Sequence, residues 1–176
     1  NKNYYLINSL DEIDKWIEEA EEVGEVAVDT ETTSLDPHQA DLVGISLCSK
    51  IGKACYIPVG HKSPKCLKKE GVIKKLKKIL EDPSIKKIGQ NIKFDFIVFY
   101  KCGITLSSME DTMLMSYVLD AGKNRHNMDT LSEIHLGHKT ISFKEMVGTG
   151  KKEINFSEVE IDKAKDYAAE DADVTF

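Results

Sequence analysis

The alternation of apolar and polar residues divides the chain into a strand-rich beginning and a helix-rich remainder. Residues 9–22 have helical spacing, and Ser9 with Glu12 three residues later predicts an N-cap with a capping box. Three apolar runs joined by turn-rich links follow as predicted strands, at residues 25–30, 42–48 and 54–58. Strands spaced this closely favour an antiparallel meander.

After Pro64 the pattern changes from the period of strands to that of helices. One short strand is still predicted, at Lys86–Ile88. The predicted helices lie near residues 69–81, 92–101, 111–120, 128–136 and 142–147, and a last one starts at Ser157 or Asp162 and reaches the chain end. A meander followed by alternating helix and strand predicts an α/β fold, in which a mixed sheet carries helices on its faces.

Segment 62–78 is rich in lysine and could be read as a track for phosphates. The apolar residues of its second half and of the two positions after it fall on one helical stripe, formed by Val72, Ile73, Leu76, Ile79 and Leu80. The lysines then lie on the opposite side of the helix. This arrangement favours a solvated helix face over a phosphate-binding track.

Composition narrows the class of protein. The chain has 176 residues, the size of one domain, with 41% hydrophobic and 31% charged residues. Without an apolar run of about 20 residues or a signal-peptide pattern, neither a membrane span nor secretion is expected. The four cysteines include no CxxC pair, which predicts free thiols in a reducing cytoplasm. Because the chain begins with Asn1 and its last helix has no stop signal, we expect a piece of a longer protein.

The net charge does not indicate a strong nucleic-acid-binding protein, and the histidines do not indicate a zinc site. A net charge of −6 argues against strong non-specific binding of nucleic acid, but it allows an enzyme that meets phosphates through a bound metal. His135 and His138 lack Cys or Glu partners at zinc-like spacing, so we expect a structural role for them.

Two carboxylates stand where the first predicted strand ends. Val26 and Val28 alternate along the strand, and Asp29 and Glu31 follow with one residue between them. Residues i and i+2 of a strand share a face, so both carboxylates should lie side by side. Like charges held so close require a cation or a proton. A solvated pair stays an alternative, because the chain has 30 acidic residues and such pairs occur by chance.

Two predicted helices supply further candidates, each with a structural alternative. Asn91 and Asp95 are four residues apart and share a helix face, as do Tyr167 and Asp171. A helix N-cap at Asn91 with Asp95 in the first turn would also explain the first pair. Asp111 precedes a strongly apolar helix, which favours an N-cap over a metal ligand.

Taken together, the carboxylates of one strand and two helices predict an oxygen-only metal site. Hard oxygen ligands select Mg²⁺ or Mn²⁺ over zinc. Two such ions about 3.5–4 Å apart can clamp a phosphodiester. The acidic neighbours Glu170 and Asp173 are expected to point to solvent.

Three motifs in this order and spacing are similar to a known family. DTETTSLDP, GQNIKFD and YAAEDADVT resemble the proofreading 3′–5′ exonuclease domain of bacterial DNA polymerase I, in the tyrosine subgroup of the DEDD exonucleases. YIPVGH, MEDTMLMSYVLDAG and HNMDTLSEIHLGHKTISF extend the resemblance over nearly the whole chain. It implies a ribonuclease H-like fold with a mixed five-stranded sheet, one exonuclease domain at residues 1–176, and a covalently linked polymerase domain.

The resemblance also implies roles for the candidate residues. Asp29 would contact two divalent ions, Glu31 and Asp171 would complete the shell of the first, and Asp95 would hold the second, through water. Tyr167 would orient the attacking water, and a tyrosine pKa of about 10 suits this role better than that of a base. The expected products are 5′ mononucleotides cut from single-stranded or frayed DNA 3′ ends, as in proofreading.

The same resemblance implies residues that hold the substrate end. Leu35 and Phe143 match family positions that pack against the terminal bases, although Phe143 alone would be read as a core aromatic. Gln90 and Asn91 are candidates for bonds to the terminal sugar or phosphate. Two other functions stay open: trimming of RNA 3′ ends by a ribonuclease D-like enzyme, and a catalytically silent module that binds DNA ends or braces a polymerase. Contacts to the 2′-OH, which the metal site does not make, would decide between DNA and RNA.

Overall fold

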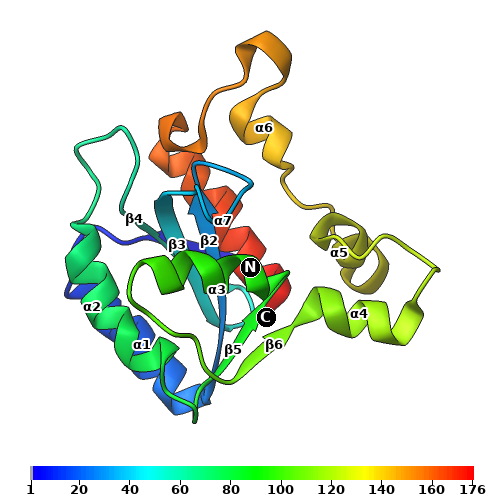
Figure 1. Ribbon diagram of the computed structural model, residues 1–176, viewed down its shortest axis with the longest axis horizontal. Coiled ribbons are helices and arrows are strands. Elements are labelled where there is room, and N and C mark those ends of the chain that lie inside the picture. Colours follow the sequence, from blue (N-terminus) through cyan, green and yellow to red (C-terminus); the bar gives the residue numbers. More distant parts are fainter. Residues whose placement is uncertain (1) are drawn as a thin grey trace.

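A six-stranded mixed sheet forms the centre of the computed structural model, which describes residues 2–176 (Figure 1). The order across the sheet is β1-β4-β3-β2-β5-β6. Strand β3 is antiparallel to both of its neighbours, and the other neighbouring pairs are parallel. The strands are β1 (Asn3–Leu6), β2 (Glu25–Thr32), β3 (Leu42–Lys50), β4 (Lys53–Pro58), β5 (Lys86–Gly89) and β6 (Met109–Asp111).

Seven α-helices and two short 3-10 helices complete the secondary structure of residues 2–176. The α-helices are α1 (Glu12–Val23), α2 (Lys69–Leu80), α3 (Ile92–Lys101), α4 (Thr112–Asp120), α5 (Met128–Leu136), α6 (Phe143–Val147) and α7 (Ile161–Thr175). The 3-10 helices are η1 (Gly150–Lys152) and η2 (Phe156–Glu158). Every predicted helix is present, and the last one begins near the later of its two predicted starts.

The meander predicted for β2, β3 and β4 is confirmed, but the sheet has one strand more than the expected five. Strands β1 and β6 have four and three residues and pair in parallel with strands distant in sequence. Periodicity needs a longer run to indicate a strand. Their formation depends on tertiary pairing, which a local pattern does not record.

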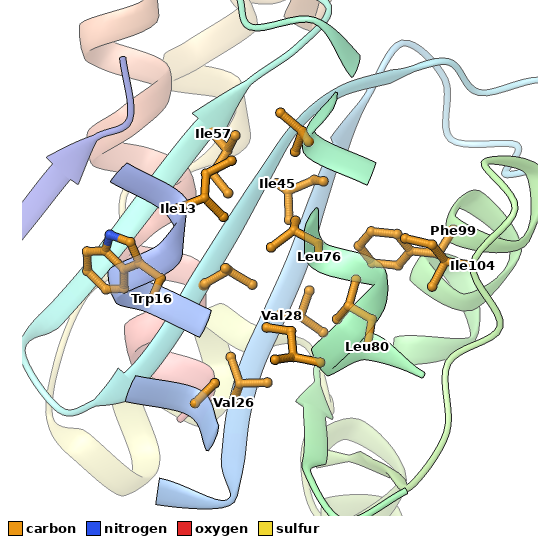
Figure 2. Close-up of a cluster of buried hydrophobic side chains, with 14 of the residues drawn as sticks. Ile13, Trp16, Val26, Val28, Ile45, Ile57, Leu76, Leu80, Phe99 and Ile104 are labelled. Atoms are coloured by element: carbon orange, nitrogen blue, oxygen red, sulfur yellow. The ribbon is translucent and has the colours of Figure 1, made fainter. Parts of the chain in front are cut away.

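Helices α1, α2 and α3 cover one face of the sheet with a continuous apolar core (Figure 2). Helix α2 buries Leu76 and Leu80, whereas Lys75 and Lys78 on its other side form ion pairs with Asp14 and Glu21 of α1. Lys74, Lys77 and Lys78 are exposed, which confirms the solvated lysine face predicted for this helix. The other labelled core residues are Ile13, Trp16, Val26, Val28, Ile45, Ile57, Phe99 and Ile104.

Helix α7 crosses the opposite face and approaches the sheet through small side chains. Its contact residues include four fully buried alanines, Ala164, Ala168, Ala169 and Ala172. They pack against residues of β2, β3 and β4. Because an alanine adds only a methyl group, the helix backbone lies close to the strands, and short side chains of α7 can reach groups on the sheet.

The start of α1 differs from the prediction. The helix begins at Glu12, and Asp11 occupies the N-cap position without a capping bond from its side chain. Glu12 instead accepts hydrogen bonds from the backbone N–H of Asn8 and from the Ser9 hydroxyl, at 3.1 and 3.3 Å. Ser9 is therefore not the N-cap. The Ser–Glu pair closes the turn before the helix.

Asp111 caps two helices at once. As predicted, its carboxylate accepts the N–H groups of Met113 and Leu114 at the start of α4. It also accepts the N–H groups of Asn91 and Ile92 at the start of α3, at 3.0 and 3.1 Å. Asn91 occupies the N-cap position of α3 as the alternative predicted, but its side chain makes no capping bond and Asp111 supplies the cap instead. One buried carboxylate thereby joins the first turns of α3 and α4.

Helices α4 and α5 extend beyond the β6 edge of the sheet (Figure 1). Within residues 2–176, no residue of α4 is buried. Across the same residues, no helix has the length and apolar character needed to cross a membrane.

Candidate active site

Strand β2 carries Asp29 and Glu31 on the face that α7 covers. The strand continues to Thr32, and Asp29 and Glu31 pair with Ser46 and Gly44 of β3. The two carboxylates therefore lie within the strand rather than after its end. Gly44 leaves room beside Glu31 for the ring of Tyr56, since a Cβ there would lie 2.1 Å from the tyrosine oxygen.

Helix α7 brings Asp171 to this pair. Single ligand oxygens of Asp29, Glu31 and Asp171 lie within 4.8 Å of one another. Tyr167 is one helical turn before Asp171 and lines the same cleft. The buried alanines of α7 permit this approach, because a bulkier contact residue would move the helix and its carboxylate away from the sheet.

Asp95 enters the site from the other layer of the fold, on α3. Its carboxylate accepts the Thr30 N–H at 2.9 Å and the Thr30 hydroxyl at 2.5 Å. These bonds hold Asp95 to the strand residue between Asp29 and Glu31, and Asp95 is 2% exposed. The structure thus places three carboxylates in one tight group and holds the fourth beside it.

Burial and mutual repulsion disfavour the charged forms of these carboxylates. Burial raises the pKa of Asp29 to about 7. Burial, followed by the charges of Asp29, Asp171 and Asp95, raises the pKa of Glu31 well above its usual value. The pKa values of Asp171 and Asp95 are also raised by burial first and then by Asp29. Such groups are stabilised in their charged form when a cation is bound.

The donor set fits a divalent, oxygen-loving cation. Oxygens of three carboxylates, two of them buried and that of Asp29 half-buried, are close enough to share one ion, and within residues 2–176 no lysine or arginine lines the cleft to neutralise them. The group contains no sulfur or nitrogen ligand, which favours Mg²⁺ or Mn²⁺ over zinc. His135 and His138 are not part of this group.

Tyr167 keeps its proton in this environment. Burial raises its pKa far above 10, and the neighbouring charges of Asp171, Glu31 and Asp29 raise it further. A neutral phenol donates and accepts hydrogen bonds but does not remove protons. The environment of Tyr167 therefore suits positioning of a polar group rather than general base catalysis.

All nine residues singled out from the sequence line one cleft of about 820 Å³. Leu35, which is 89% exposed, projects at its rim. The nine residues are Asp29, Glu31, Leu35, Gln90, Asn91, Asp95, Phe143, Tyr167 and Asp171.

One side of the cleft is built from stacked aromatic rings. Phe143 of α6 stacks on Phe156 of η2, with ring centroids 6.0 Å apart and planes 9° apart. Phe156 is tilted against Tyr167 at 5.9 Å. Phe156 is buried, whereas Phe143 is 41% exposed and presents the outer ring of the stack. An exposed ring above a buried one offers a flat apolar surface next to the carboxylates.

Gln90 and Asn91 differ in their freedom to meet a ligand. The Gln90 amide donates to the His126 carbonyl at 2.7 Å and accepts from the Thr112 hydroxyl, so protein partners occupy both of its ends. Asn91 has a left-handed backbone with φ of 59°, and its N–H is held by Asp111. Gln90 is positioned to anchor the segment before α5, while Asn91 lines the cleft.

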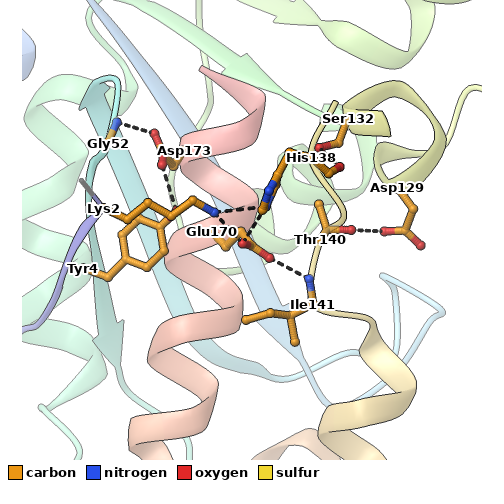
Figure 3. Close-up of polar contacts among 10 residues, drawn as sticks. All are labelled: Lys2, Tyr4, Gly52, Asp129, Ser132, His138, Thr140, Ile141, Glu170 and Asp173. Carbon is orange, nitrogen blue, oxygen red and sulfur yellow. Dashed lines mark hydrogen bonds and ion pairs between the residues drawn. The ribbon is translucent and has the colours of Figure 1, made fainter. Parts of the chain in front are cut away.

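Glu170 and Asp173 do not point to solvent, contrary to the prediction (Figure 3). The Glu170 carboxylate is buried, pairs with Lys2 and His138, and accepts the Ile141 N–H at 2.6 Å. Asp173 accepts the N–H of Gly52, the hydroxyl of Tyr4 donates to it, and these bonds join α7 to β1 and to the β3–β4 turn. The prediction was wrong because α7 also packs on β1, an edge strand of the sheet that the pattern did not indicate, and against the segment before α6.

The Glu170 contacts also support the aromatic side of the cleft. They fix residues 138–141, which lead directly into Phe143. His138 thus has the structural role expected from the sequence. Sequence reasoning missed Phe156, which lies outside the motifs, and Thr30, which lies inside the first motif but whose bonds to Asp95 join segments 65 residues apart. For Phe156, the sequence shows an apolar residue between polar neighbours in a loop. This pattern indicates that the ring is buried, but not which ring it stacks against.

Sequence comparison places the chain among known proteins. The family model described as "3′-5′ exonuclease", that of the A-type DNA polymerases, matches residues 4–176. The chain belongs to this exonuclease family. DNA polymerase I of Rhizobium leguminosarum is 44% identical over 98% of the chain, and that of Pseudomonas aeruginosa is 45% identical over 92%. The exonuclease chain covers only 19% and 18% of these two relatives, about a fifth of their length.

Solved structures share the fold of the exonuclease chain. Escherichia coli RNase D, described as an exoribonuclease, superposes with a TM-score of 0.72 at 21% identity, over 98% of this chain and 42% of its own. Brucella melitensis NrnC with bound Mg²⁺ gives 0.68 at 25% identity, over 97% and 73%. The expected ribonuclease H-like fold is confirmed, with six strands in place of five.

Proposed function

We propose that this domain is a metal-dependent 3′–5′ exodeoxyribonuclease that removes 5′ mononucleotides from the 3′ ends of DNA, as part of a DNA polymerase chain. The observation that supports it most is the group of buried carboxylates beside a partly exposed aromatic stack, in one cleft. The family and the polymerase relatives support the same reading.

In this proposal the carboxylates divide between two metal positions. Asp29, Glu31 and Asp171 would hold one divalent ion, and Asp29 with Asp95, the latter through water, would hold the second. When bound, the two ions supply an activated water and neutralise charge on the departing 3′ oxygen. Thr30 keeps Asp95 in place through its two hydrogen bonds, so this ligand is oriented before any ion arrives. Tyr167 orients the attacking water through its neutral hydroxyl.

The remaining residues of the cleft hold the strand end. Phe143 and Leu35 present apolar surface to the last bases, and stacking of this kind does not depend on sequence. Asn91 is the candidate for a hydrogen bond to the terminal sugar or phosphate. We assign Gln90 to holding the cleft wall, because its amide is already bonded at both ends.

Trimming of RNA is the second candidate function. It is favoured by the fold shared with E. coli RNase D and with Trypanosoma brucei RNase D in complex with RNA U12, with TM-scores of 0.72 and 0.78. The comparison with DNA polymerase I at 44–45% identity outweighs these likenesses, which have 21% and 13% identity. A catalytically silent module is disfavoured because all four candidate carboxylates are present in the cleft.

The deciding experiment compares hydrolysis of single-stranded DNA and RNA oligomers of matched sequence, with Mg²⁺ and with Mn²⁺. We expect DNA to be shortened from its 3′ end with release of 5′ mononucleotides. Faster cleavage of RNA would favour the ribonuclease reading. The absence of any cleavage with Mn²⁺ would leave the silent module as the function.

We expect the domain to prefer an unpaired DNA 3′ end. The last phosphodiester must reach the buried carboxylates while the bases meet Phe143, which requires separated strands. Separation costs a few kcal/mol in a matched duplex and less at a mismatch. Degradation of one labelled strand should therefore be fastest when it is alone, slower with a 3′ mismatch and slowest when fully matched. Equal rates on the three substrates would contradict a proofreading role.

Phe143→Ala is expected to weaken binding of a single-stranded 3′ end by about 1–3 kcal/mol, the scale of one base stack. Binding can be measured by fluorescence anisotropy in Ca²⁺ or EDTA. Tyr100→Ala is the matched control, because Tyr100 is 64% exposed, also stacks on a phenylalanine, and lies outside the cleft lining. If both variants bind the single-stranded 3′ end with equal affinity, Phe143 serves only to pack on Phe156.

A further inference from the structure

Helix α4 is apolar on most of its sides and yet uncovered. Five of its nine residues are large hydrophobic side chains with 42–80% exposure. A helix with apolar residues all round is normally buried in a protein core. The five residues are Leu114, Met115, Tyr117, Val118 and Leu119.

The exposed side chains form one wall of a groove between α3, β6 and α4. This groove has a volume of about 730 Å³. We call its apolar residues the α4 face: Ile92, Phe96, Met109, Leu114, Met115, Val118 and Leu119. The charged residues of the lining are Lys93 and Asp111, and the Asp111 carboxylate is fully engaged in capping. A groove with a single lysine and otherwise apolar walls is poorly suited to a phosphate backbone and suits an apolar protein surface.

The α4 face is separate from the cleft that holds the carboxylates. None of its residues among 2–176 lines that cleft, and none of the nine candidate site residues belongs to the face. The DNA end in the proposed function therefore does not cover it.

The relatives indicate what covers it. About four-fifths of each DNA polymerase I relative lies outside the region matched by this chain. A module tethered on the same polypeptide has a high effective concentration, so a single apolar groove is enough to dock it. We propose that the α4 face is the docking surface for the polymerase portion of the same polypeptide. This inference rests on the proposed function insofar as that function includes a linked polymerase.

The test compares the reactivity of two introduced cysteines in the complete natural polypeptide. Val118→Cys places a thiol on the α4 face, and Ile51→Cys places one at the β3–β4 turn; both residues are 80% exposed in the structure of this domain. Each chain is pulsed with a maleimide under native conditions, and labelling is measured on the peptide carrying the new cysteine by mass spectrometry. Peptide-level readout separates the new thiol from the native cysteines, including the four of this domain.

We expect the cysteine at position 118 to react at least about tenfold more slowly than the one at position 51, since a docked surface opens only transiently. The two should react equally in denaturant. Equal native rates would overturn the proposal. Protection that disappears on dilution would also overturn it, because the occupant would then be a second copy of the chain.

The outcome is independent of catalysis. A chain that is protected at position 118 but cleaves neither DNA nor RNA would reject the proposed nuclease function and leave the docking surface intact. A chain that cleaves DNA but is labelled equally at positions 118 and 51 would support the nuclease function and reject the docking surface.

Discussion

Replacing Asp29 or Asp171 by alanine is expected to reduce hydrolysis by at least about 1,000-fold, because a bound metal supplies several kcal/mol of transition-state stabilisation. Both side chains belong to the trio whose oxygens lie within 4.8 Å of one another. The rate of shortening of single-stranded DNA in Mg²⁺ measures the effect. Asp166→Ala is the matched control for Asp171, since Asp166 lies on the same helix, is exposed and is not part of the cleft lining.

The same substitutions should not unfold the protein. The pKa of Asp29 is about 7 in the folded, metal-free chain and about 3.9 when unfolded, so the folded chain binds its proton more tightly. Stability of the metal-free protein therefore falls as pH rises from about 4 to about 7, and Asp29→Ala removes this contribution. A melting curve in EDTA near pH 8 should show the variant at least as stable as the wild type. An inactive variant that is also unfolded would assign Asp29 a structural role instead.

Tyr167→Phe is expected to slow hydrolysis by a factor of about 10–1,000, the scale for losing one positioning contact. The loss should fall on kcat, because the ring and its packing against Phe156 are kept. The dependence of the rate on pH should match the wild type, since a phenol with a raised pKa does not titrate in the assay range.

If Tyr167→Phe loses as much hydrolysis rate as Asp171→Ala and its rate no longer depends on pH, Tyr167 does not merely position the water. This result would mean that the Tyr167 hydroxyl takes part in proton transfer. Phe143→Tyr is a suitable companion, because it adds a hydroxyl to the same aromatic group without touching the carboxylates.

The sequence predicted those features that depend on local pattern. The meander β2–β3–β4, the amphipathic helix α2 and the cap at Asp111 follow from the spacing of apolar residues and from helix-end chemistry. The motifs also identified residues that the fold brings into one cleft, because strand alternation and helical spacing fix which side chains share a face.

What the sequence did not predict depends on contacts between distant segments. Glu170 is an ordinary surface residue by type, and only the packing of residues 138–141 over α7 buries it. Strand β1 forms only because β4 offers an edge to it. Asp111 was recognisable as the cap of the helix that follows it. Its second role, at the start of α3, was not, because its partners Asn91 and Ile92 lie about 20 positions earlier in the chain.

The alanines of α7 have a genetic consequence. Helix and sheet are separated by side chains one methyl group in size at Ala164, Ala168, Ala169 and Ala172, each fully buried. Single-nucleotide changes in an alanine codon give valine, threonine, serine, proline, aspartate or glutamate, as well as glycine, and all but glycine are larger. Added bulk in a tight core costs about 1–3 kcal/mol and shifts the backbone. A lineage can therefore lose its exonuclease in one mutational step while every carboxylate of the three motifs remains in its genome.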